Sequence, residues 1–90
     1  KSALIGFSKS LALESAGKGI TSNVIAPGYI NTEMVAAIRE DILNKIVESI
    51  PTKRLGSSEE IADMVLYLAS DKSSYINGAT FSVNGGLWMD

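Results

Sequence analysis

The chain lacks cysteine and histidine altogether, and it has only two prolines and one tryptophan among its 90 residues. Without cysteine there is no disulfide framework. A metal site would have to be built from carboxylates alone, and the acidic residues show no clustered spacing, so we expect no metal site. No apolar run approaches the roughly 20 residues that a membrane span requires, and no signal peptide is visible, although a segment before Lys1 could have carried one.

Charge is sparse and nearly balanced, with 8 basic and 10 acidic residues and a formal net charge of −2. Because the lysines and arginines are scattered, the sequence lacks the basic patch that nucleic-acid binding requires. Hydrophobic residues make up 46% of the chain, which is enough to form a core. Composition therefore predicts a cytoplasmic α/β protein, or a piece of one, that binds neither nucleic acid nor membrane.

Hydrophobic periodicity switches between helical and strand patterns along the chain. The expected order is a helix over 1–17, a strand over 20–26, two short helices within 34–50 that break near 39–41, a helix over 58–70 and a strand over 79–83. Ser57 followed by Glu60 forms a capping box ahead of the last helix. Since a long helical crossover separates the two strands, we expect them to be parallel.

The first expected helix begins at Lys1 without an N-cap, which would place a cation at the positive end of the helix dipole. Two strands are also too few to form an independent sheet. We therefore expect this chain to be a fragment of a longer protein, cut inside a helix.

Residues 27–32 (Pro-Gly-Tyr-Ile-Asn-Thr) lie between an expected strand and a helix that opens at Glu33. In α/β sheets ligands bind at the carboxyl ends of the strands, where backbone N–H groups are unpaired and a helix start favours anionic groups. The alternative is an ordinary turn, because proline, glycine, asparagine and threonine are all common in turns.

Five landmarks together resemble the C-terminal third of a short-chain dehydrogenase/reductase, and the resemblance covers essentially all 90 residues. They are Lys1 before a small-residue helix, residues 27–32, Arg-Leu-Gly at 54–56, Glu-Glu-Ile-Ala at 59–62, and Val-Asn-Gly-Gly at 83–86. Residues 34–51 and 84–87 are most similar to bacterial acetoacetyl-CoA reductases, followed by 3-oxoacyl-carrier-protein reductases.

The resemblance implies a doubly wound parallel sheet of the Rossmann type, with residues 1–90 as the C-terminal segment of one dinucleotide-binding domain and a lid at about 33–50. Lys1 matches the family's catalytic lysine, which follows a catalytic tyrosine by four residues on one helix face. This lysine tunes the tyrosine and holds the cofactor's ribose; the alternative is a solvated helix lysine. The tyrosine, a catalytic serine and the glycine-rich loop would lie upstream, so the fragment alone is expected to be inactive.

The resemblance also assigns roles within residues 27–32. Pro27 and Gly28 would pack beside the nicotinamide, and the Ile30 backbone would hold its carboxamide. The Thr32 hydroxyl would reach the carboxamide or a phosphate. Tyr29 would face the substrate, although a packed aromatic residue is the alternative.

The implied reaction is reduction of a 3-oxoacyl thioester, such as acetoacetyl-CoA, to the 3-hydroxyacyl thioester by NADPH. The thioester carrier could be coenzyme A or acyl carrier protein, and NAD could replace NADP. Two competing hypotheses stay open: a family member acting on another alcohol or ketone, and a truncated fragment that only associates with subunits. Candidates for contacts with coenzyme A phosphates, unless they are ordinary surface charges, are Arg39, Lys45, Lys53 and Arg54.

The two longest expected helices carry apolar residues on two faces each, and only one face of each can cover a sheet. Soluble monomers avoid large exposed apolar patches. The final strand lies next to a sheet edge and ends in Gly85 and Gly86, which permit close approach of a second backbone. Two self-complementary surfaces, one on the helices and one at this strand, each closed by its own twofold axis, generate a D2 tetramer. We therefore expect the complete protein to be a homotetramer, as the family resemblance also implies.

Overall fold

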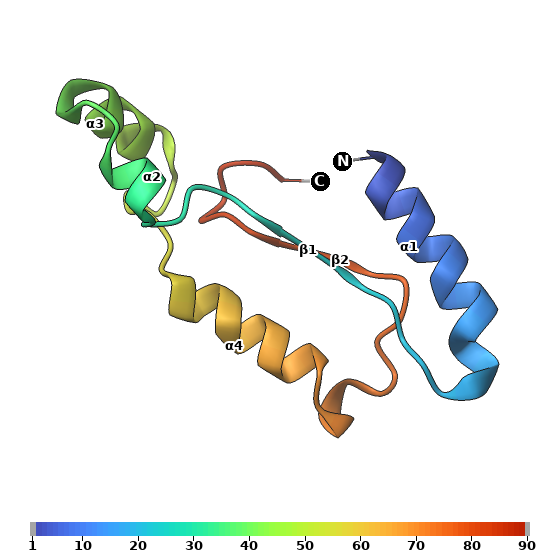
Figure 1. Cartoon of the computed structure of the whole chain (residues 1–90). Helices are drawn as coiled ribbons and strands as arrows, with labels where there is room; N and C mark the ends of the chain where they lie inside the picture. Colours follow the sequence, from blue (N-terminus) through green and yellow to red (C-terminus); the bar gives the residue numbers. More distant parts are fainter. Residues whose placement is uncertain (1, 90) are drawn as a thin grey trace. The chain divides into compact units, whose positions relative to one another are not determined.

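The computed structural model describes residues 2–89 of the chain (Figure 1). Its elements are α1 (Ser2–Ser15), a 3-10 turn (Ala16–Lys18), β1 (Val24–Pro27), α2 (Glu33–Ala36), α3 (Glu40–Ser49), α4 (Ser58–Leu68), a second 3-10 turn (Asp71–Ser73) and β2 (Thr80–Val83). The expected order of helices and strands is confirmed.

The strands β1 and β2 pair in a two-stranded sheet (Figure 1). The Val24 N–H donates to the Ala79 carbonyl at 2.9 Å, and the Gly28 N–H donates to the Val83 carbonyl at 2.9 Å. The two residue numbers rise together from one bond to the next, so the strands are parallel. The expected α/β class with parallel strands is therefore confirmed.

The strand β1 starts later than the expected 20–26, because the side chains of Asn23 and Asn77 take over several of the hydrogen bonds just before it. The Ser22 N–H donates to Asn77 Oδ1 at 2.9 Å. Asn23 Nδ2 donates to the Ile76 carbonyl at 3.1 Å, and Asn23 Oδ1 accepts from the Ala79 N–H at 3.0 Å. Such local bonds compete with a strand ladder. The expectation of a strand over 20–23 was wrong.

The predicted helix signals hold. The break near 39–41 appears between the end of α2 at Ala36 and the start of α3 at Glu40. The capping box also forms: the Glu60 N–H donates to Ser57 Oγ at 3.2 Å, and the Ser57 N–H donates to Glu60 Oε1 at 3.0 Å. Two orphan donors at the start of α4 are thereby satisfied.

The chain divides into two compact units, one running up to Ile25 and including Met64–Phe81, the other comprising Ala26–Asp63 and the chain from Ser82. In the first unit, Ala12 of α1 is 3% exposed, and its carbonyl accepts from Asn77 Nδ2 at 3.2 Å. In the second, Ile50 is 2% exposed. Each unit has a small buried centre of its own.

Much of the apolar surface of the two longest helices is uncovered. Leu4 and Phe7 of α1 and Leu66 of α4 are 59%, 66% and 71% exposed. Such faces are available for further protein to cover, and the expected tetramer stays a prediction. Within residues 2–89, no helix combines the length and the apolar character needed to traverse a bilayer.

Gly28 follows β1 directly, and replacing it with alanine should destabilise the complete protein. A Cβ at this position would lie 2.7 Å from Asn84 Cβ and 2.9 Å from Asn84 Cα, so backbone would have to shift. We expect a loss of about 1–3 kcal/mol in the free energy of unfolding, measured by chemical denaturation.

Gly6 in α1 is the matched control, since an added Cβ there meets no atom within 4 Å. Gly6→Ala should be neutral or stabilise by up to about 1 kcal/mol. Equal unfolding free energies for the two variants would contradict the close approach of Gly28 and Asn84.

Candidate functional site

The carboxyl end of β1 leads into a backbone pairing between Ile30 and Gly56, an isolated parallel bridge. The Gly56 N–H donates to the Tyr29 carbonyl at 3.0 Å, and the Asn31 N–H donates to the Gly56 carbonyl at 2.8 Å. In a parallel bridge these bonds flank the central residue, whose own N–H and carbonyl point to the other side. Within residues 2–89, neither group of Ile30 has a hydrogen-bond partner. Ile30 therefore offers one donor and one acceptor at a strand end.

The expectation of unpaired N–H groups at this strand end holds for part of the segment, since within residues 2–89 the N–H groups of Tyr29, Ile30 and Thr32 have no hydrogen-bond partner. The N–H groups of Gly28 and Asn31 are both paired within the protein. The helix that follows, α2, spans only Glu33–Ala36 and carries an acid in its first turn. So short a helix has little dipole to attract an anion. Within residues 28–32, Ile30 is the residue whose N–H and carbonyl are both left unpaired.

Thr32 is the N-cap of α2, and its Oγ1 accepts from the Val35 N–H at 3.4 Å. A hydroxyl that accepts one bond still has a hydrogen to donate. The side chain is exposed, so this hydrogen can reach a ligand. Capping and ligand binding are compatible roles for Thr32.

Two neighbouring residues shape the surface beside Ile30. Gly28 packs against Asn84 so closely that no side chain fits between them. Pro27, the last residue of β1, is exposed and presents an apolar ring. The pair offers a flat surface with a close backbone approach.

Tyr29 packs on an aromatic ring that the sequence analysis did not single out. Its ring centroid lies 6.2 Å from that of Trp88, with the planes at 40°. Asn84 Nδ2 donates to the Trp88 carbonyl at 2.8 Å and so fixes the turn that carries the indole. Tyr29 also lines a hollow of about 140 Å³. The other lining residues are Thr52, Arg54, Gly56, Glu60, Val83, Asn84 and Gly85.

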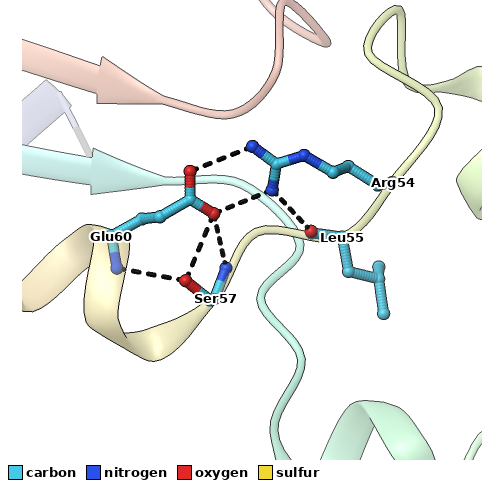
Figure 2. A network of polar contacts seen from close by, with 4 residues as sticks. All are labelled: Arg54, Leu55, Ser57 and Glu60. Carbon is cyan, nitrogen blue, oxygen red and sulfur yellow. Dashed lines mark hydrogen bonds and ion pairs between the residues drawn. The ribbon is translucent and has the colours of Figure 1, made fainter.

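A polar network surrounds Glu60 at the start of α4 (Figure 2). Its two carboxylate oxygens accept from the two terminal nitrogens of Arg54 at 2.8 and 3.0 Å. Arg54 also donates to the Leu55 carbonyl at 3.2 Å. Hydrogen bonds from Arg54 and from the Ser57 N–H lower the pKa of Glu60 from 4.5 to about 2.

Most of the basic candidates are engaged within the protein. Arg54 is held by Glu60, and Arg39 pairs with Asp41 at 2.8 Å. Lys53 Nζ donates to the Glu48 carbonyl at 2.6 Å. Lys1, the candidate catalytic residue, lies outside the described residues, so its role stays a prediction. The described residues contain no group of three or more potential metal ligands.

A family model described as enoyl-(acyl carrier protein) reductase matches residues 1–88. The chain belongs to the short-chain dehydrogenase/reductase family. The structure matches the C-terminal part of a Rossmann-type domain in a 3-oxoacyl-(acyl-carrier protein) reductase from Brucella melitensis, with a TM-score of 0.95 and 44% sequence identity. That match covers 99% of this chain and 33% of the other.

Curated relatives in the family carry several different names. Nodulation protein G of Azospirillum brasilense is 56% identical over 97% of this chain, and acetoacetyl-CoA reductase of Cupriavidus necator is 55% identical over 99%. A 3-oxoacyl-(acyl-carrier-protein) reductase of Escherichia coli is 53% identical over 99%. The chain spans only 35–36% of these relatives, about a third of their length.

Residues 27–32 were predictable as a site from the sequence, but the segment that supports them was not. Arg54 was expected as a candidate contact for coenzyme A phosphates, and Leu55 and Gly56 were only part of a family landmark. The available signal was the spacing of Arg54 and Glu60 around a capping box, which places opposite charges near one helix start. Nothing in the sequence pattern indicated that Trp88 would contact Tyr29.

The low pKa of Glu60 predicts a pH dependence for this network. A carboxyl whose folded pKa lies below its unfolded value stabilises the fold above the unfolded value. For Glu60 this contribution is present above about pH 4.5 and is lost as the pH falls toward about 2. Nuclear magnetic resonance titration of the Glu60 carboxyl in the complete protein should therefore give a midpoint near 2.

Arg54→Met tests the cause of the shift. Because Arg54 is the largest influence on the Glu60 carboxyl, its removal should move the midpoint upward toward 4.5. An unchanged midpoint in this variant would show that Arg54 does not hold the carboxylate.

Proposed function

We propose that this chain acts as the C-terminal part of a reductase that uses NADPH to convert a 3-oxoacyl thioester to the 3-hydroxyacyl thioester. The observation that carries the proposal is the pair of unpartnered backbone groups on Ile30, at a strand end where α/β proteins bind cofactors. The names of the Cupriavidus and Escherichia relatives support the substrate class.

The residues at this strand end suit a nicotinamide carboxamide, which has one carbonyl acceptor and one NH₂ donor. The Ile30 N–H would donate to the carboxamide oxygen, and the Ile30 carbonyl would accept from its nitrogen. The Thr32 hydroxyl would add a donor for the carboxamide or a phosphate. Pro27 and Gly28 would pack beside the nicotinamide ring. When bound, NADPH supplies the hydride that the keto carbon receives.

Lys1 would tune the tyrosine that donates a proton to the substrate oxygen, the step that completes the alcohol. We propose that it follows a catalytic tyrosine by four residues on one helix face. An ammonium ~4 Å from a phenolate stabilises it by about 4 kcal/mol at an effective dielectric constant of ~20. This lowers the tyrosine pKa by roughly three units, so the phenol can donate its proton to the substrate oxygen near neutral pH. Lys1 would also hold the ribose.

The remaining parts of the proposal concern the lid and the assembly. Residues 33–50, which include α2 and α3, would close over the nicotinamide and acyl chain and exclude water. Tyr29 would contact the substrate. The exposed apolar faces of α1 and α4 would be covered in a cytoplasmic homotetramer.

Substrate choice between the two thioester carriers is tested by following NADPH oxidation by the complete protein. We expect turnover with both acetoacetyl-CoA and acetoacetyl-carrier-protein, and a higher kcat/KM with acetoacetyl-CoA. A higher kcat/KM with the carrier protein would instead favour a role in fatty-acid synthesis. Turnover of simple ketones but of neither thioester would contradict the proposed substrate class. Parallel assays with NADH test the cofactor.

Lys1→Ala should lower kcat/KM of the complete protein by about a hundredfold or more, because the tyrosine loses the charge that tunes it. The limb of the pH profile that reports ionisation of the tyrosine should shift to higher pH, and the cofactor should bind more weakly. Lys9→Ala is the matched control, since Lys9 is an exposed lysine of α1 with no assigned role. Retention of more than about a tenth of the activity in Lys1→Ala would contradict the assignment.

A further inference from the structure

Residues 54–57 lie alongside residues 29–31 and hold them by main-chain bonds alone. Gly56 uses its N–H on the Tyr29 carbonyl and its own carbonyl on the Asn31 N–H. A Cβ on Gly56 would lie 2.8 Å from Ile30 Cδ1, so the two segments are in close contact. The direction of the free Ile30 groups therefore depends on where Gly56 lies.

Residues on both sides of Gly56 in the sequence, Arg54 and Ser57, bind one carboxylate, that of Glu60 (Figure 2). On one side, Glu60 binds the Arg54 guanidinium through both oxygens. On the other, Glu60 Oε1 accepts from the Ser57 N–H at 3.0 Å and from Ser57 Oγ at 3.2 Å. Arg54 also donates to the carbonyl of Leu55, the residue directly before Gly56. We call this set of contacts the Arg54–Glu60 clamp.

The exposure of the clamp limits its contribution to global stability, including the pH-dependent part that comes from Glu60. The Arg54 and Glu60 side chains are 60% and 43% exposed. Exposed ion pairs contribute little to global stability, whereas a two-pronged contact to a planar guanidinium restricts geometry strongly. The Glu60 carboxylate is charged throughout the neutral range, and the hydrogen bonds from Arg54 and Ser57 that lower its pKa favour this charged form. Restricting local geometry is therefore the effect that this clamp is best suited to provide.

We infer that the Arg54–Glu60 clamp is a positioning device for the nicotinamide, because it fixes Gly56 and thereby aims the backbone groups of Ile30. The inference rests on the proposed function. Arg54 and Glu60 act through the backbone of residues 29–31 and need not touch the cofactor. Arg54 is accordingly assigned to this role and not to coenzyme A phosphates.

The test compares Glu60→Ala with Glu59→Ala in the complete protein. Both variants remove one negative charge from the first turn of α4, but Glu59 belongs to no ion pair among residues 2–89. Dissociation constants are measured by isothermal titration calorimetry for NADPH and for its analogue without nicotinamide, 2′-phosphoadenosine diphosphoribose. Losing an anion alone should tighten binding of both anionic ligands, so weaker binding of NADPH cannot come from net charge.

We expect Glu60→Ala to raise the NADPH dissociation constant about fivefold or more, while the analogue changes by less than about twofold. Glu59→Ala should leave both constants within about twofold of the wild type. Glu60→Gln keeps an acceptor for Ser57 and so protects the start of α4. It should also raise the NADPH dissociation constant.

Three results would overturn the inference. Equal NADPH constants for Glu60→Ala and Glu59→Ala would show that the clamp positions nothing. Equal weakening of NADPH and of the analogue would indicate a general structural defect. If the wild-type protein bound NADPH no more tightly than the analogue, the nicotinamide would add no affinity. That result would refute the proposed function itself, and the inference with it.

Discussion

The two hydrogen bonds of Gly56 are the constraint on which the rest of the candidate site depends. They hold the Tyr29 carbonyl and the Asn31 N–H, and this leaves the N–H and carbonyl of Ile30 facing the opposite side. Without them, residues 29–31 would be a loop with no defined direction. With them, the Ile30 peptide presents one donor and one acceptor at the carboxyl end of β1, which is where we propose that an amide group binds.

Several weak features combine to make this constraint specific. Gly56 can lie close to Ile30 because it has no side chain, and Gly28 can lie close to Asn84 for the same reason. The Glu60 carboxylate serves the helix cap and Arg54 at once. Each contact is modest alone, but together they define the backbone on both sides of Ile30.

Local signals in the sequence predicted most of the elements because their causes are local. The capping box of Ser57 and Glu60 and the order of helices and strands could be read from neighbouring residues. The start of β1 could not, because Asn77 and Asn23 bond across more than 50 positions of sequence. The same holds for the site: residues 27–32 were recognisable, whereas the support from Gly56 and the contact of Trp88 with Tyr29 are long-range pairings.

The most direct measurement of the central claim is amide hydrogen exchange of the complete protein with and without NADPH. The Ile30 amide, unpaired within residues 2–89, should exchange rapidly in the free protein and slow by about tenfold or more when NADPH binds. The Asn31 amide, already bonded to Gly56, is the internal control and should be protected in both states. An Ile30 exchange rate that is the same with NADPH bound would contradict the claim that this peptide holds the nicotinamide.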